Sequence, residues 1–262
     1  MNQQEKRLWL IRQLLAENSR YRDIRIPSGE PDQKDLLRAL MNVRPPEPLS
    51  EEVLAVQDEY LSEENLKSGI TDPAALKPCR LSPQICLWQG DITTLKADAI
   101  VNAANSGMTG CYQPLHGCID NIIGSKAGIR LRLRCSCIMR EQGYPEPAGR
   151  AKITPGYCLP CRYIIHTVGP IVEGQLTQEH ERLLASCYRS CLELAEENRL
   201  NSIAFCCIST GVFMFPNQRA AEIAVQTVKA WLDETGSGMQ VIFNVFKDID
   251  REIYERLLNG IG

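Results

Sequence analysis

One short stretch of the chain, "GCYQPLHGCIDN" at residues 110–121, carries four side chains that could do chemistry. Cys111, His116 and Cys118 offer two thiols and an imidazole, and the Asp120 carboxyl follows two residues later. Zinc binds such ligands tetrahedrally, and catalytic zinc sites use three protein ligands and keep a fourth position open. The spacing suits a loop that wraps one ion. Three buried polar side chains with no metal would give the same pattern, so the spacing alone leaves both interpretations open.

The remaining candidates for metal or redox chemistry are weaker. Cys158 and Cys161 form "CLPC", which has the spacing of a redox or zinc-knuckle motif. This pair lacks a second pair and a nearby histidine, and it leads directly into the apolar run "RYIIHTV". We therefore predict a structural role for both cysteines, a core position for His166 and a surface position for His180. His116 is then the one histidine of the chain that we expect to act in a site.

Composition limits the function classes. The chain has 262 residues, a net charge of −3 and 44% hydrophobic residues, and it has no excess of Lys and Arg that would favour bulk nucleic-acid binding. A nucleotide-sized ligand stays possible, because backbone amides can hold phosphate. No apolar run approaches the roughly 18 residues of a membrane helix, and the N-terminus does not resemble a signal peptide. We expect a cytoplasmic protein without a membrane partner, whose twelve cysteines are mostly buried thiols.

The elements that must position the reactive loop fall into two parts. Residues 1–80 form a predicted helical N-terminal extension of three or four short helices, interrupted by prolines at 45, 46 and 48. This part carries no chemical motif, and we expect it to pack as an appendage. Residues 81–262 alternate strands and helices, which predicts an α/β layered domain with a largely parallel central sheet.

Apolar runs predict strands at 84–90, 97–105, 162–169, 202–209 and 239–246, and amphipathic patterns predict helices at 118–143, 177–199, 217–236 and 250–260. Ligands settle at the carboxyl ends of strands in such sheets, so the loops that follow the strands are candidates for binding. "GDI" at 90–92 follows the first strand. Two glycine-bearing loops, "NAANSGMTG" at 102–110 and "STGVF" at 209–213, follow two further strands and could present backbone amides to a pyrophosphate. Simple tight turns would look the same, and neither glycine-bearing loop matches a phosphate-loop or dinucleotide fingerprint.

Three of these segments together carry a family resemblance. "GDITTLKADAIVNAANSGMTG", "YIIHTVGP" and "CISTGVFMFPNQRAAEIA" resemble, in order, the signature segments of macrodomains, the ADP-ribose-binding α/β/α modules. The loop "GCYQPLHGCIDN" and the helical extension resemble the zinc-containing microbial macrodomain hydrolases that remove ADP-ribose from proteins. In that class a Cys/His/Cys zinc loop replaces the usual glycine-rich first loop. The resemblance implies a three-layer α/β/α fold with a mixed, largely parallel sheet, and Zn²⁺ held by Cys111, His116 and Cys118.

The resemblance also implies a role for each site residue. Asp91 would accept a hydrogen bond from the adenine amino group, and Ile92 would offer its backbone amide to the same ring. Asn105 would reach the distal ribose, and Asp120 would orient or deprotonate the attacking water. The loop 209–213 would wrap the diphosphate. The residues implied to bind substrate are Asp91, Ile92, Asn105, Ser209, Thr210, Gly211, Val212 and Phe213.

The implied reaction is hydrolysis of the bond between the distal ribose and a protein side chain, with Asp120 and Asn105 as catalytic residues. The partner would be a mono-ADP-ribosylated protein, and the product would be ADP-ribose. Three alternatives remain: an ADP-ribose-binding reader without turnover, an O-acyl-ADP-ribose deacylase, and an interaction module with a purely structural zinc. Gly124 and Met214 depart from the usual family residues, and this puts the shape of the distal ribose pocket, and so the substrate preference, in doubt.

Overall fold

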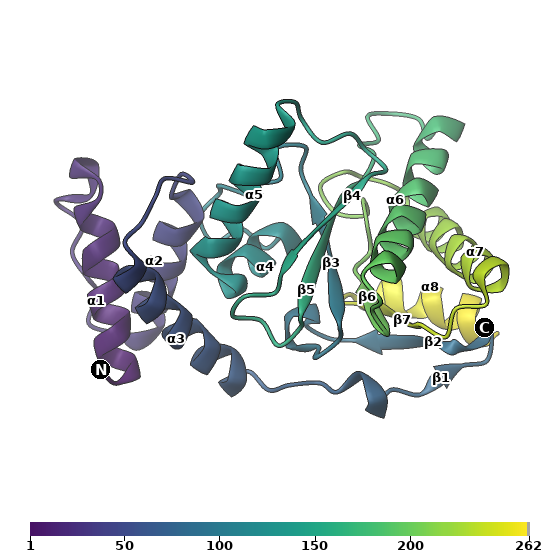
Figure 1. The fold of residues 1–262 in the computed structure, drawn as a ribbon, viewed down its shortest axis with the longest axis horizontal. Coiled ribbons are helices and arrows are strands. Elements are labelled where there is room, and N and C mark those ends of the chain that lie inside the picture. Colours follow the sequence, from purple (N-terminus) through teal and green to yellow (C-terminus); the bar gives the residue numbers. More distant parts are fainter. Residues whose placement is uncertain (261–262) are drawn as a thin grey trace.

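The fold is built around one sheet with helices on both sides, as a computed structural model that describes residues 1–260 shows (Figure 1). The strands lie in the order β1-β2-β7-β6-β3-β5-β4. The strands are β1 (Pro78–Cys79), β2 (Ser82–Gln89), β3 (Ala99–Ala104), β4 (Ala151–Pro155), β5 (Tyr163–Val168), β6 (Ser202–Phe205) and β7 (Gln240–Val245). The helices are α1 (Gln3–Ala16), α2 (Glu30–Val43), α3 (Glu51–Lys67), α4 (Ile119–Ala127), α5 (Ile129–Gln142), α6 (Gln178–Glu197), α7 (Asn217–Thr235) and α8 (Asp248–Asn259).

The sheet is mixed and largely parallel, which confirms the predicted fold class. The inner pairs β2–β7, β7–β6, β6–β3 and β3–β5 are parallel, whereas β1 and β4 pair antiparallel at the two edges. The inner strands carry continuous apolar runs because helices cover both of their faces. Ile85, Ile100, Ile165 and Ile203 are fully buried in this core. Figure 1 shows α4 and α5 on one side of the strands and α6 and α7 on the other.

The predicted helix over 118–143 is two helices, so this prediction is wrong in detail. The chain breaks at Gly128, whose φ of 96° is a conformation that favours glycine. A Cβ at this position would lie 2.5 Å from the Gln57 side-chain nitrogen. Gln57 Oε1 accepts a hydrogen bond of 2.8 Å from the Ile129 amide, the first of α5. A side chain of the extension therefore caps the start of α5.

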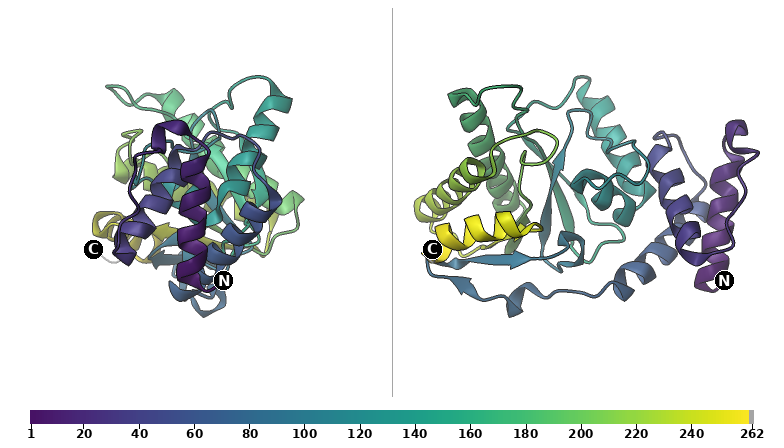
Figure 2. Two further views of the ribbon diagram at one scale, coloured as in Figure 1. Left: turned by 90° about the vertical axis from the view of Figure 1, so that its left-hand side faces the viewer. Right: turned by 180° about the vertical axis from the view of Figure 1, so that it is seen from behind.

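The helical extension lies at one end of the molecule, with α1 farthest from the sheet (Figures 1 and 2). Its helices bury their own apolar cluster, which includes Leu10, Ile11 and Leu37 and also takes in Ile129 and Cys158 of the sheet domain. The chain then runs along the molecule from Lys67 to β1, which already pairs with β2. The division at residue 80 stays a prediction. Among the described residues, no helix combines the length and apolarity that crossing a membrane requires.

Candidate active site

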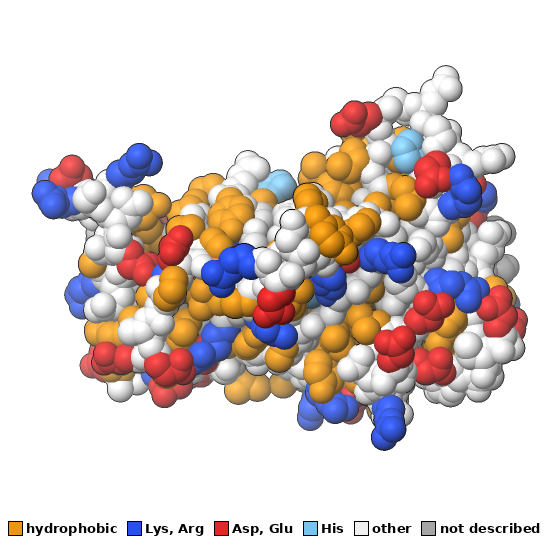
Figure 3. Space-filling view, turned by 45° about the horizontal axis from the view of Figure 1, so that its top comes forward, with side chains coloured by type: hydrophobic (Ala, Val, Ile, Leu, Met, Phe, Trp, Pro, Cys, Tyr) orange, Lys and Arg blue, Asp and Glu red, His pale blue; other side chains and the backbone are white. Residues whose placement is uncertain are grey.

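The carboxyl ends of the inner strands open into one large cavity of about 590 Å³. This cavity brings together all the residues predicted to bind substrate, act in catalysis or hold metal. Its walls include Asp91, Ile92, Asn105, Cys111, His116, Cys118, Asp120, Ser209, Thr210, Gly211, Val212 and Phe213. On the face that forms the top of Figure 1, hydrophobic side chains gather between charged ones (Figure 3). The cavity is large enough for a nucleotide-sized ligand.

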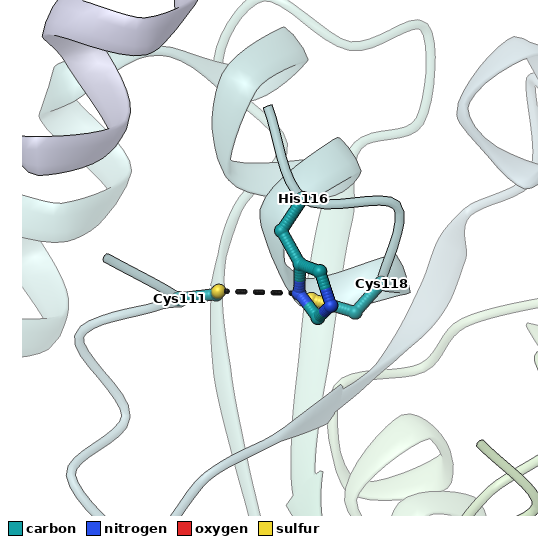
Figure 4. Close-up of side chains that lie close together, drawn as sticks. All are labelled: Cys111, His116 and Cys118. Carbon is teal, nitrogen blue, oxygen red and sulfur yellow. Dashed lines mark hydrogen bonds between the residues drawn. The ribbon is translucent and has the colours of Figure 1, made fainter. Parts of the chain in front are cut away.

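The three predicted metal ligands lie close together at the cavity wall (Figure 4). One ligand atom from each of Cys111, His116 and Cys118 lies within 4.8 Å of the others, and they form the one such cluster found among residues 1–260. Cys111 Sγ lies 3.5 Å from His116 Nδ1. Ligand atoms around a tetrahedral zinc ion are roughly 3.6 Å apart, given the usual Zn–S and Zn–N lengths. The donor set and its spacing therefore fit zinc with little movement.

The environment of Cys118 also suits a metal-bound thiolate. Cys118 precedes α4, and its Sγ accepts a hydrogen bond of 3.4 Å from the Asn121 amide. Burial raises the pKa of the thiol to about 11, and the nearby Cys111 and Asp120 also raise it. Without a cation this thiol would stay protonated at neutral pH. A divalent cation would displace the proton, which is the usual coupling of metal binding to thiol ionisation.

Asp120 lies in the first turn of α4 and is held by two amides. Its Oδ1 accepts a hydrogen bond of 2.8 Å from Asn102 Nδ2, and its Oδ2 accepts one of 3.4 Å from Asn105 Nδ2. The residue is only 8% exposed, and burial raises the pKa of the carboxyl to about 6, against the Asn102 hydrogen bond and the Arg132 charge that lower it. The two amides fix the direction in which the carboxyl faces the cavity.

A buried polar chain stands behind Asp120. Asn102 Nδ2 also lies 3.1 Å from His166 Nδ1, and His166 Nε2 lies 2.9 Å from Thr154 Oγ1. An amide nitrogen can only donate, so Nδ1 must accept and the imidazole proton must be on Nε2. Burial lowers the pKa of His166 to about 4, so the ring is neutral at physiological pH. His166 is a core histidine as predicted, but it also orients the amide that holds Asp120.

Asp91 is ionised and already engaged at the cavity wall. Burial raises its pKa, but hydrogen bonds from Thr93 and Lys126 and the Lys126 charge outweigh this, so the pKa lies below its usual value. Lys126 Nζ lies 3.0 Å from Asp91 Oδ2. The next residue, Ile92, buries its side chain in the core, which leaves its backbone to face a ligand.

The loop at 209–213 has the unusual backbone that a ligand-wrapping loop requires. Ser209 has a φ of 65°, and its carbonyl accepts a hydrogen bond of 3.0 Å from the Phe215 amide, which closes the loop. The Ser209 side chain is buried, and its Oγ has no hydrogen-bond partner within residues 1–260. Gly169 makes room for it, since a Cβ there would lie 2.0 Å from Ser209 Oγ. Val212 is 69% exposed at the cavity mouth.

Several supporting residues escaped the sequence predictions. Arg132 and Arg38 contact the site, yet no motif contains them. Asn102 lies in the predicted binding segment "NAANSGMTG", but no role is predicted for it, and its polar side chain within the apolar strand β3 is a further signal. By contrast, Cys158 and Cys161 are buried and lie outside the metal-type cluster of the described chain, in keeping with the structural role predicted for them.

The fold and the site together define an α/β module with a ligand-sized cavity at the carboxyl ends of its strands, and comparison with known proteins identifies its class. The family model described as "Macro domain" matches residues 101–224. A "Protein-ADP-ribose hydrolase" from Treponema medium is 57% identical over 261 residues, which cover 99% of this chain and 100% of that protein. The chain therefore belongs to the macrodomain family, which confirms the resemblance carried by its motifs.

Solved structures of macrodomains share the fold. An Oceanobacillus iheyensis macrodomain with ADP is 40% identical, with a TM-score of 0.61 over 66% of this chain and 88% of that chain. A Trypanosoma brucei macrodomain in complex with ADP-ribose is 30% identical, with a TM-score of 0.65 over 84% of this chain and 95% of that chain. The match to the Trypanosoma brucei structure covers 84% of this chain, whereas the sheet domain predicted at 81–262 is under 70% of it. This match therefore extends into the helical extension or its connection to the sheet domain.

Proposed function

We propose that this protein is a hydrolase that removes mono-ADP-ribose from modified protein side chains, with Zn²⁺ held by Cys111, His116 and Cys118. One observation carries the proposal: the cavity that holds the predicted ADP-ribose-binding residues also holds a buried carboxyl and a metal-type trio. The 57% identical relative named protein-ADP-ribose hydrolase, and the macrodomain structures with ADP and ADP-ribose, support the substrate class. We further propose a cytoplasmic location, because all twelve cysteines are free thiols, as a reducing compartment favours.

Asp91 and Ile92 would bind the adenine, and the loop 209–213 would wrap the diphosphate. The backbone of this loop closes on itself through the Ser209–Phe215 bond, and Gly211 leaves open space beside it. The distal ribose would then reach Asn105 and Asp120, which lie side by side in the same cavity.

The bond to be broken joins the ribose anomeric carbon to a side chain, and its cleavage places positive charge on the sugar. The Asp120 carboxylate can stabilise that charge or take a proton from the attacking water. Asn102 and Asn105 keep it in place by donating to its two oxygens. Zinc, when bound, lowers the pKa of a bound water or polarises an oxygen of the substrate. A reader without turnover would need neither the carboxyl nor the trio, which favours the hydrolase.

The test measures release of ADP-ribose from proteins modified at acidic, serine or arginine side chains, alongside hydrolysis of a small O-acyl-ADP-ribose ester. Asp120→Ala should reduce turnover by about 10²–10⁴-fold, the usual size of a lost acid–base group. Its ADP-ribose affinity, measured by calorimetry, should stay within about threefold, because the adenine and diphosphate contacts are elsewhere. Wild-type protein that binds ADP-ribose but releases none from any modified protein would refute the hydrolase and leave a reader or, if the ester is cleaved, a deacylase.

The metal is tested separately. Cys118→Ala should lose bound zinc and turnover together, whereas Cys137→Ala, a half-buried cysteine on α5 outside the cluster, should lose neither. Metal content by mass spectrometry and turnover are measured on the same preparations. Full activity in metal-free Cys118→Ala would remove zinc from the mechanism but leave the proposed reaction standing.

A further inference from the structure

The helical extension contacts the metal-type loop through α2. Figure 1 and the right-hand view of Figure 2 place α2 between α1 and the α4–α5 pair. Arg38 Nη2 of α2 donates a hydrogen bond of 2.8 Å to the backbone carbonyl of His116 and another of 2.8 Å to Asn121 Oδ1. Its Nε lies 3.3 Å from Ser125 Oγ. One guanidinium thus ties a proposed ligand to the helix that follows the loop.

Asn42, one turn further along α2, holds the neighbouring residue. Its Oδ1 accepts a hydrogen bond of 3.1 Å from the Leu115 amide, and its Nδ2 donates one of 2.9 Å to Ser125 Oγ. Leu115 has a φ of 56°, which a leucine rarely adopts and which surrounding contacts must maintain. The peptide between Leu115 and His116 is therefore flanked on both sides by bonds from α2.

Arg132 of α5 joins the same helix to the start of the loop. Its Nη1 donates to the carbonyls of Met41, Asn42 and Arg44, at 3.0, 2.8 and 2.6 Å, where α2 ends. These carbonyls lack partners within the helix, so a buried cation suits them. Its Nη2 lies 3.3 Å from the carbonyl of Cys111. Two of the three proposed ligands, Cys111 and His116, thus have backbone carbonyls bonded to an arginine that contacts or belongs to α2.

We infer that α2 is a positioning element of this site, which holds the loop 110–118 in the conformation that brings two thiols and an imidazole together. Arg38 and Asn42 are its positioning residues. The inference rests on the proposed function for the identity of the bound metal, but the ordering of the loop is independent of it. It gives the extension, which carries no chemical motif, a part in the reaction.

The test compares Arg38→Ala, Arg38→Lys and Asn42→Ala with Lys6→Ala, whose ion pair of 3.0 Å with Glu59 lies within the extension. Zinc affinity is measured by competition with a chromophoric chelator. Losing partners that orient metal ligands costs about 10–100-fold in affinity, so we expect such losses in Arg38→Ala and Asn42→Ala and none in Lys6→Ala. Arg38→Lys keeps the positive charge but loses the fork of donors. A zinc affinity between those of wild type and Arg38→Ala would show that the charge and the donor geometry each contribute.

Three further readouts distinguish positioning from a general loss of structure. Turnover should fall in the variants and recover in excess zinc, while ADP-ribose affinity stays close to the control value and each metal-free protein still unfolds in one cooperative transition. Amide hydrogen exchange at residues 111–118 should be faster in both alanine variants than in Lys6→Ala. Unchanged exchange together with unchanged zinc affinity would overturn the inference. Wild-type protein that binds no zinc would refute the proposed metal, and the exchange comparison would still decide whether α2 orders the loop.

Discussion

The buried imidazole of His166 makes the stability of the protein depend on pH by an amount that can be worked out. The side chain is 1% exposed, and its Nδ1 accepts a hydrogen bond from Asn102, so protonating it breaks a bond and buries a charge. Burial lowers the pKa to about 4, against about 6.5 in an unfolded chain. The unfolded chain therefore takes up a proton first as the pH falls.

The sign and size of the effect follow from proton linkage. Stability from neutral His166 is fully present above about pH 6.5 and is lost as the pH falls toward 4, since over that range only the unfolded state binds the proton. With these two pKa values, the loss is about 2 kcal/mol between pH 7 and pH 5, and about 3 kcal/mol in all.

The assay is urea unfolding of wild-type protein and His166→Asn at pH 7 and pH 5. An Asn Oδ1 can accept the bond from Asn102 but cannot reach Thr154, so we expect the variant to be less stable at pH 7 by about 1–3 kcal/mol. It should then lose about 2 kcal/mol less than wild type on acidification. Other groups, including Asp120, titrate in both proteins and largely cancel in the difference. A pH dependence equal within about 0.5 kcal/mol in the two proteins would refute the neutral, buried imidazole.

Two further substitutions test the binding loop and the attachment of the extension. Gly169→Ala places a Cβ 2.0 Å from Ser209 Oγ and 2.9 Å from Ile208 Cγ2, so these side chains must shift at the start of the loop 209–213. ADP-ribose affinity, measured by calorimetry, should then fall by about tenfold or more. Gly238→Ala adds a methyl in open space and is the control; equal affinities would contradict the predicted role of the loop. Asn65→Ala removes a donor to two backbone carbonyls across the boundary of the extension, at 3.0 and 2.8 Å, and should cost about 2 kcal/mol in urea unfolding. A cost below about 0.5 kcal/mol would show that these carbonyls find other partners.

The sequence predicts the inner strands well and the edges poorly, for a physical reason. β3, β5, β6 and β7 are buried on both faces, so most of their residues are apolar and the run is visible without a partner. β4 at the edge is only five residues long and mostly half-buried, and no apolar run marks it. The break at Gly128 has a local signal in the glycine, but its Gln57 neighbour lies seventy-one residues earlier, which no local pattern shows.

The residues of the site also divide into some that the sequence predicts and others that it does not. Cys111, His116 and Cys118 come from one loop, so their spacing alone suggests a shared ion, and the structure brings their ligand atoms together. Their roles remain predictions. Arg38 and Asn42 come from a separate helix about 75 residues earlier, and their importance depends on which face of α2 packs against the loop. An arginine on an amphipathic helix is ordinarily a solvated charge, so nothing in the sequence distinguishes this one.

The nine-residue helix α4 explains how α2 can affect the position of the Asp120 carboxyl. Residues three or four apart share a face of a helix. Asn121 and Ser125 share the face that α2 contacts, whereas Asp120 lies on the next face and lines the cavity. Ile122 and Lys126 share a third, where Lys126 pairs with Asp91. A rotation of α4 would therefore move Asp120 and the Cys118 cap together. For that reason contacts from α2 to one face of α4 can orient both the Asp120 carboxyl and the loop 110–118.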